Sequence, residues 1–205
     1  MKAILLSIRP EWLVKILNGE KTIEVRKNKA IANAIKELIK QYGKALIYMY
    51  CSKEHSGWCM VGINGHKSYY EKYSKKSVYS PNTHEIGNGK VVARFWCDNV
   101  DRIWKTTTSV WLYETEMSNK LYEKSCLSDI ELDRYFKPKA LGFRYTYGHA
   151  IHISKLEIFD KPKELSEFYH YVKYNKKQAE ENKQDWDFCK LTKAPQSWCY
   201  VEEVK

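Results

Sequence analysis

The chain has 205 residues, of which 43% are hydrophobic and 29% are charged, so it can bury a sizeable core beneath a well-solvated surface. Its length suits one domain with an elaboration, or one and a half small domains. Lys and Arg outnumber Asp and Glu by 35 to 25, which favours anionic partners, with nucleic acid first and a membrane surface second. No run of about 18 apolar residues is present, which excludes a membrane-spanning helix.

The cysteines and the first residues predict an intracellular protein. The six cysteines, at positions 51, 59, 97, 126, 189 and 199, include no CxxC pair. The apolar residues 3–8 meet Arg9 and Pro10 without a small-residue cleavage site, so they predict a first strand rather than a secretion signal. We therefore expect reduced thiols, a cytoplasmic location, no metal and no cofactor.

The first 51 residues predict strands that alternate with amphipathic helices. Pro10 suits the first turn of a helix, and Gly19 and Gly43 suit the left-handed residue that ends one. Apolar residues recur at helical spacing in two segments and at strand spacing in three. The expected elements are strand 3–8, helix 10–17, strand 21–26, helix 31–42 and strand 45–51.

Residues 52–90 differ from the rest of the chain in composition. Five of the nine glycines lie here, and the segment 66–79 contains four lysines and four tyrosines. Such a mixture can bind single-stranded nucleic acid by stacking and charge, but a solvated loop over packed tyrosines has the same composition. We expect an insertion with little regular structure.

The rest of the chain predicts further strands and one well-capped helix. Ser128 and Glu131 have the spacing of a capping box, which predicts a helix over 128–136. Residues 91–100 predict a long strand, residues 147–159 are rich in strand, and residues 160–162 predict a turn. The charged segment 170–193 includes residues 171–183, which suit a solvated helix, and residues 193–201 predict an ordered edge strand.

Charged and polar side chains alternate with apolar ones in the strand expected at 21–26. Side chains on a strand alternate between its faces, so Thr22, Glu24 and Arg26 share one face while Ile23 and Val25 face the core. An Arg fork matches phosphate or carboxylate, and Glu accepts from an exocyclic amine such as that of cytosine. We expect a polar pocket with Lys21 at its entrance, although a surface Glu–Arg pair has the same pattern.

The same segment carries a family resemblance. Gly19-Glu20-Lys21-Thr22-Ile23-Glu24-Val25-Arg26, preceded by Ser7-Ile8-Arg9-Pro10 and a helix, resembles the ASCH family signature G-x-K-x-x-E-x-R. Segments 148–154, 160–165 and 194–201 resemble later parts of ASCH-like proteins from bacterial and phage genomes. The resemblance covers both ends and the middle of the chain but not residues 52–90.

The resemblance implies an α+β fold, a PUA-like mixed β-barrel with short flanking helices and an inserted loop region. It implies a single domain over residues 1–205, with the insertion at about 52–90 and the charged segment at about 170–193. It also implies a polar cleft at residues 19–26 that binds RNA or a nucleotide.

A related activity in the wider group is the removal of the acetyl group from acetylcytidine, which uses a Lys, a Thr nucleophile and a distant Glu. Lys21 matches the Lys, but Glu24 stands at the nucleophile position, and Thr22 is not the matching residue. Glu131 is one candidate for the distant Glu. A carboxylate beside two cations is a good acceptor and a poor base, which favours binding over catalysis. Lys21 and Glu24 are the candidate catalytic residues.

Three hypotheses about function follow from the sequence. The first is an RNA- or nucleotide-binding domain, the second a hydrolase of acylated cytidine or a ribonuclease, and the third a phage-related protein-interaction module. No membrane partner is expected. Packing in the core competes with a binding role for each aromatic candidate. The candidate ligand-binding residues are Arg9, Lys21, Thr22, Glu24, Arg26, Arg144, Tyr147, His149 and Trp198.

Overall fold

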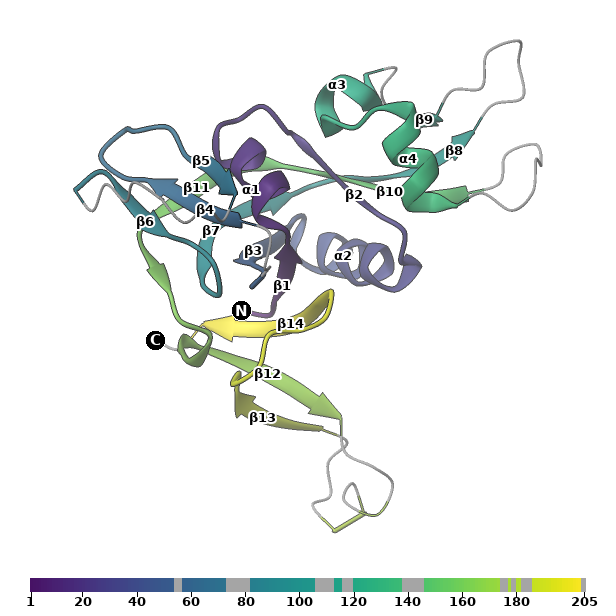
Figure 1. Cartoon of the computed structure of the whole chain (residues 1–205). Helices are drawn as coiled ribbons and strands as arrows, with labels where there is room; N and C mark the ends of the chain where they lie inside the picture. Colours follow the sequence, from purple (N-terminus) through teal and green to yellow (C-terminus); the bar gives the residue numbers. More distant parts are fainter. Residues whose placement is uncertain are drawn as a thin grey trace. The chain divides into compact units, whose positions relative to one another are not determined.

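The computed structural model describes most of the chain as an α+β protein in which strands predominate (Figure 1). The described residues are 1–53, 57–72, 82–105, 113–115, 120–137, 146–173, 177, 180–181 and 186–203. They divide into two compact units. The first unit comprises Met1–Leu17, Leu46–Arg94 and Glu157–Lys205, and the second comprises Asn18–Ala45 and Phe95–Leu156.

The largest sheet has seven strands. Its order is β11 (Ser154–Lys163), β7 (Val91–Cys97), β3 (Ala45–Cys51), β1 (Ala3–Ile8), β14 (Trp198–Glu203), β12 (Phe168–Lys173) and β13 (Trp186–Lys190). The central strand β1 pairs parallel with β3 and antiparallel with β14. β3 is buried along its whole length and β1 at all but one position, as their unbroken apolar sequences require.

A second sheet belongs to the second unit. Its order is β2 (Ile23–Arg26), β10 (Thr146–His152), β8 (Val100–Lys105) and β9 (Tyr113–Thr115), all antiparallel. The helices α3 (Leu121–Ser125) and α4 (Asp129–Phe136) lie beside these strands in Figure 1 and share an apolar cluster with Ile23 and Val25. The helix α2 (Lys29–Tyr42) packs against β2, β8 and β10.

The third sheet lies within the segment expected to be an irregular insertion. It has the order β5 (Tyr69–Lys72), β4 (Gly57–Gly62) and β6 (His84–Ile86), and α1 (Pro10–Leu17) packs on β4 and β5. The expectation of little regular structure was therefore wrong. Cys59, Met60 and Val61 are fully buried, and their burial stabilises strands in a segment whose glycine-rich composition indicates a loop.

Two predicted helix ends are confirmed. Gly43 ends α2 at φ 76°, although α2 begins two residues before the expected start, where Asn28 accepts a hydrogen bond from the Ala30 N–H at 2.7 Å. Ser128 and Glu131 form the predicted capping box of α4. These ends depend only on neighbours in sequence, which is why a local pattern predicted them.

Two further expectations about the second half of the chain were wrong. Residues 160–162 lie inside β11 rather than in a turn, and β14 is an interior strand rather than an edge. In the charged segment 170–193, residues 177, 180 and 181 are helical within the expected helix 171–183, while β12 extends to Lys173 and β13 begins at Trp186. Phe188 on β13 stacks on Tyr169 of β12 at 4.8 Å and contacts Tyr171 at 5.0 Å, and these cross-strand pairs stabilise the hairpin.

The α+β class is confirmed, but the described strands form open sheets rather than a barrel. β11 and β13 are the two ends of the seven-stranded sheet, and β2 and β9 are the two ends of the four-stranded sheet. Closure would require hydrogen bonding between such end strands. None of the described helices is long and apolar enough to cross a bilayer.

Candidate functional site

Charged side chains are buried at strand β2, in the middle of the ASCH-like segment. Lys21, just before the strand, is 2% exposed, and Glu24 is 6% exposed. The Glu24 carboxylate lies 3.4 Å from Lys21 Nζ through Oε2 and 2.9 Å from Arg26 Nε through Oε1. One carboxylate therefore joins two cations, and the group keeps a net positive charge.

Lys21 was expected at the entrance of a pocket, and the structure instead buries it. Its ammonium donates a hydrogen bond to the Ser125 carbonyl at the end of α3, at 2.8 Å, as well as contacting Glu24. Burial lowers the pKa of Lys21 below its ordinary value of 10.5, although the nearby Glu24 opposes the shift. Helix α3 contacts Lys21, and the alternation of polar and apolar residues along β2 could not predict this contact.

Arg26 belongs to a row of nitrogen-bearing side chains that crosses three strands. In the register of the sheet, Arg26 of β2 lies opposite His149 of β10, which lies opposite Arg102 of β8. Directly opposed residues project to the same face, so these three side chains are neighbours. His149 is buried, Arg26 is half-buried and Arg102 is exposed, so the row reaches solvent at its Arg102 end.

Arg102 was missed by sequence reasoning because nothing local distinguishes it. Its strand has the pattern Val100-Asp101-Arg102-Ile103, in which an exposed Arg is ordinary. Only the pairing of β8 with β10 places it beside His149. The apolar anchors of β2 were predictable, and Ile23 and Val25 are buried in the cluster with α3 and α4.

The remaining sequence candidates of this unit have other roles or lie outside the described residues. Thr22 is exposed, and Tyr147 is buried against Tyr113 at 5.9 Å and Phe136 at 6.2 Å, so it forms part of the core rather than the wall of a cleft. Glu131 is occupied by the capping box. Arg144 lies outside the described residues.

A second polar cluster in this unit is structural. His152 Nε2 lies 2.8 Å from Asp101 Oδ2, and Asn99 donates to the other oxygen of Asp101 at 2.7 Å. Asp101 is 1% exposed and both of its oxygens have partners. The network satisfies a buried carboxylate beneath the sheet, as a core requires.

Arg9 and Trp198 belong to the first unit. Arg9 is exposed, and its carbonyl accepts hydrogen bonds from Trp12 N at 3.1 Å and Leu13 N at 2.9 Å, at the start of α1. Trp198 is half-buried and packs edge-on against Tyr200, with ring centroids 5.4 Å apart. Neither residue belongs to the second unit, which contains residues 19–26.

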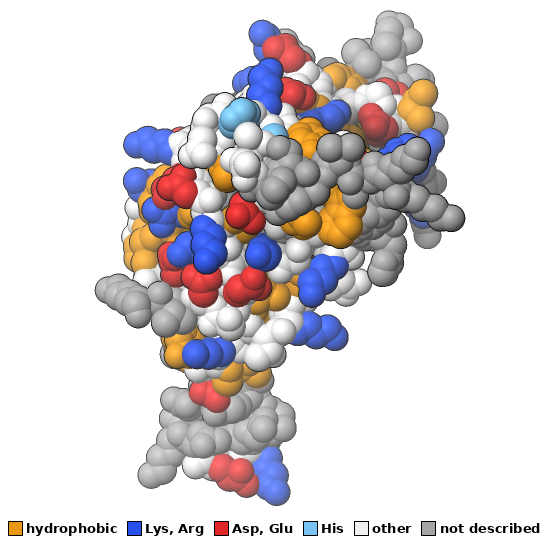
Figure 2. All heavy atoms as spheres, turned by 60° about the vertical axis from the view of Figure 1, so that its left-hand side comes forward, with side chains coloured by type: hydrophobic (Ala, Val, Ile, Leu, Met, Phe, Trp, Pro, Cys, Tyr) orange, Lys and Arg blue, Asp and Glu red, His pale blue; other side chains and the backbone are white. Residues whose placement is uncertain are grey.

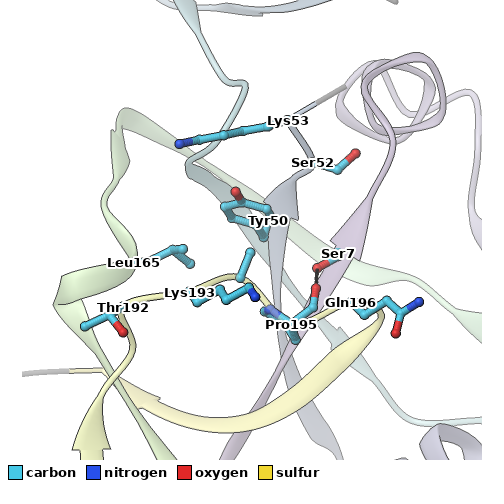
Figure 3. Close-up of a pocket in the computed structure, with 10 residues that line it drawn as sticks. Ser7, Tyr50, Ser52, Lys53, Leu165, Thr192, Lys193, Pro195 and Gln196 are labelled. Carbon is cyan, nitrogen blue, oxygen red and sulfur yellow. Dashed lines mark hydrogen bonds between the residues drawn. The ribbon is translucent and has the colours of Figure 1, made fainter. Parts of the chain in front are cut away.

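The first unit also contains a cavity of about 370 Å³ that the sequence did not indicate (Figure 3). It lies where the parallel strands β1 and β3 end, at Ser7 and Tyr50, which are register partners. The segment before β14 closes its other side. The lining residues are Ser7, Tyr50, Ser52, Lys53, Leu165, Thr192, Lys193, Ala194, Pro195 and Gln196.

The excess of positive charge does not gather in one patch on the face shown in Figure 2, where Lys and Arg alternate with Asp and Glu. On this face, binding of an anion therefore requires local geometry rather than a general basic surface. Within the described part of the chain, no group of three His, Cys, Asp or Glu residues could hold a metal ion. All six cysteines carry free thiols.

Comparison with known proteins adds no relative: no protein-family model matches the chain, and no curated sequence matches it significantly. The ASCH resemblance of residues 19–26 stays an expectation. The function must therefore be argued from the geometry of the two units.

Proposed function

We propose that the second unit binds RNA or a nucleotide through a phosphate group held on the row Arg26–His149–Arg102. The observation that carries the proposal is the register of the sheet, which sets these three side chains side by side across β2, β10 and β8. The row places a guanidinium at each end, and the Arg fork matches the geometry of a phosphate group.

The buried charges at β2 support the same proposal. Burying a charge costs free energy, and a buried salt bridge is weak evidence of stabilisation by itself. The Glu24 carboxylate lies 2.9 Å from Arg26 Nε and 3.4 Å from Lys21 Nζ. We infer that Lys21 and Glu24 orient the Arg26 guanidinium, because a guanidinium that is already oriented loses less side-chain entropy when it binds phosphate.

The ASCH-like character of residues 19–26 is consistent with this role, because the family is thought to bind RNA or nucleotides at this segment. The resemblance extends to residues 148–154, which include His149 and most of β10. Residues 19–26 and 148–154 both lie in the second unit, whereas residues 7–10, 160–165 and 194–201 of the resemblance lie in the first.

The proposal predicts that Arg102→Ala weakens binding of a short single-stranded RNA about tenfold and lowers the salt dependence by about one phosphate contact. Arg102 is exposed, so its removal leaves the core intact. Fluorescence anisotropy at a series of salt concentrations measures both quantities. Arg26→Ala should weaken binding at least as much, with circular dichroism to verify its fold.

Arg134→Ala is the matched control, because Arg134 is an exposed Arg on α4 of the same unit. Its affinity for RNA should equal that of the wild type. Equal losses in Arg102→Ala and Arg134→Ala would show a non-specific effect of charge, and no loss in Arg102→Ala and Arg26→Ala would refute the row as the binding site.

A hydrolase is the second candidate function, favoured by one specific observation. Lys21 has a lowered pKa, and Ser125, whose carbonyl accepts from Lys21, has a buried hydroxyl with no hydrogen-bond partner among the described residues. A Lys with a lowered pKa can act as a base for a hydroxyl, and this step requires the Ser125 hydroxyl, which does not contact Lys21 in this structure, to come within hydrogen-bond distance of the amine.

This candidate predicts that the protein releases the acyl group from an acylated cytidine, with a rate that rises as the pH approaches the lowered pKa of Lys21 from below. Lys21→Met and Ser125→Ala should each abolish turnover, and Thr22→Ala should not. Product analysis by liquid chromatography at high protein concentration makes the test. Turnover that persists in both variants, or that is absent from the wild type, would reject the hydrolase.

A further inference from the structure

The cavity of the first unit combines many hydrogen-bond donors with two positive charges. Hydroxyl groups come from Ser7, Tyr50, Ser52 and Thr192, ammonium groups from Lys53 and Lys193, and a carboxamide from Gln196. The ten lining residues include no carboxylate. Such a lining is electrostatically complementary to an anion with several oxygens.

The cavity is held in shape by the backbone around it. Ser7 donates its hydroxyl to the Pro195 carbonyl at 2.7 Å, and its N–H to the Ser197 carbonyl at 2.9 Å, which fixes the segment before β14 against β1. Leu191 N donates to the Phe168 carbonyl at 2.7 Å at the other end of that segment. A preformed cavity binds with a smaller entropy cost than one that must be ordered by its ligand.

Lys53 passes close to Gly89. Gly89 has φ 81°, and a Cβ added there would lie 2.5 Å from Lys53 Cε. The aliphatic part of the exposed Lys53 therefore lies against the backbone of Gly89, and its ammonium extends over the cavity in Figure 3. Neither Lys53 nor Lys193 forms an ion pair with a described residue. Glu164, an acidic neighbour, pairs with Lys90 at 3.4 Å.

Tyr50 supplies a neutral donor between the two cations. Its side chain lies between Lys53 and Lys193 in the view of Figure 3, with the hydroxyl on the side of Lys53. No described residue forms a hydrogen bond with this hydroxyl. Burial raises the pKa of Tyr50, so the hydroxyl stays protonated and can donate.

We propose that this cavity binds a small organic phosphate of about the size of a nucleoside monophosphate, with the phosphate held by Lys53, Lys193 and the Tyr50 hydroxyl. Two ammonium groups match the charge of a phosphate monoester, about −2, better than that of a single carboxylate. The volume, about 370 Å³, lies near the lower end of ligand pockets, which hold roughly 300–1,000 Å³.

The rest of the lining and the topology support the same ligand class. Leu165, Ala194 and Pro195 give an apolar side for the body of the ligand, and Gln196 can both donate and accept. Ligands of sheet proteins commonly bind at the carboxyl ends of parallel strands, and β1 and β3 end at this cavity. This proposal does not depend on the one made for the second unit.

The test is isothermal titration of the full chain with cytidine monophosphate, cytidine and inorganic phosphate. Cytidine monophosphate should bind, inorganic phosphate should bind more weakly, and cytidine should give no measurable heat. The double variant Lys53→Met and Lys193→Met, which keeps the apolar stems, should bind cytidine monophosphate at least tenfold more weakly. Tyr50→Phe should weaken the binding of cytidine monophosphate about threefold, as expected for loss of one hydrogen bond.

Two controls separate this site from the row on β2, β8 and β10. Lys161→Met removes an exposed Lys of the first unit and should leave the affinity for cytidine monophosphate unchanged. The titrations are repeated in the Arg102→Ala background, in which the row binds nucleotide weakly, so that the remaining heat reports binding in this cavity. Absence of binding at millimolar concentration in that background, or equal affinity there with and without the two Lys substitutions, would overturn the proposal. A failure to bind RNA would not bear on it.

Discussion

Replacing Glu24 with Gln is expected to destabilise the second unit by about 3–5 kcal/mol at pH 7, because removing one partner of a buried ion pair leaves the other charge uncompensated. Lys21 would lose the carboxylate while keeping its hydrogen bond to the Ser125 carbonyl, at 2.8 Å, and would lie near Arg26 without the carboxylate between them. Urea unfolding followed by circular dichroism measures the loss.

The double variant Lys21→Met and Glu24→Gln is the control for this prediction. Met fills similar volume without a charge, so the double variant should recover most of the stability that Glu24→Gln loses. Exposed ion pairs contribute less than about 1 kcal/mol to stability. A loss of that size in Glu24→Gln would therefore contradict the burial of the pair. Additive losses would show that Lys21 and Glu24 do not interact.

The pH dependence of Glu24→Gln gives an independent readout. The pKa of Lys21 is already lowered by burial, so between its folded value and 10.5 the unfolded chain binds more protons than the folded one. Stability from this group therefore rises with pH in that window. Loss of Glu24 removes the partner that opposes the shift and lowers the pKa of Lys21 further, so the variant should begin to regain stability at a lower pH than the wild type.

The elements that could be predicted from the sequence are those set by neighbouring residues. The bounds of β1, α1 and β3 follow from unbroken apolar runs and from Pro10, and α4 follows from its capping box. The facing of Ile23 and Val25 toward the core follows from strand alternation. In each case the contacts that determine the element join residues only a few positions apart in the sequence.

The features that could not be predicted depend on contacts between distant segments. The burial of Lys21 depends on Ser125, and the position of Arg102 depends on the register of β8 with β10. The cavity joins Ser7 to residues 192–196. Pairing between distant strands is set by the whole fold. In residues 52–90 and 170–193 the local composition indicated a loop or a helix, although strands form in both segments.

Gly148→Ala is expected to destabilise the second unit by about 1–3 kcal/mol, the usual cost of overpacking a core. A Cβ at this position would lie 2.4 Å from Phe136 Cε1 and 2.9 Å from the Arg26 carbonyl oxygen. Phe136 is buried in the cluster with α4, so it cannot move aside cheaply. The strain therefore falls on the pairing of β10 with β2.

The same substitution links the fold to the proposed binding site, because the strand that would be displaced carries His149, the register partner of Arg26. Gly148→Ala should therefore weaken RNA binding at a temperature at which the variant is still folded. Phe136→Leu makes room for the added methyl, so the double variant should be more stable than the sum of the single effects predicts. Strictly additive effects, or an Ala variant with wild-type stability and RNA binding, would show that the close approach of Gly148 to Phe136 and Arg26 does not hold the row in place.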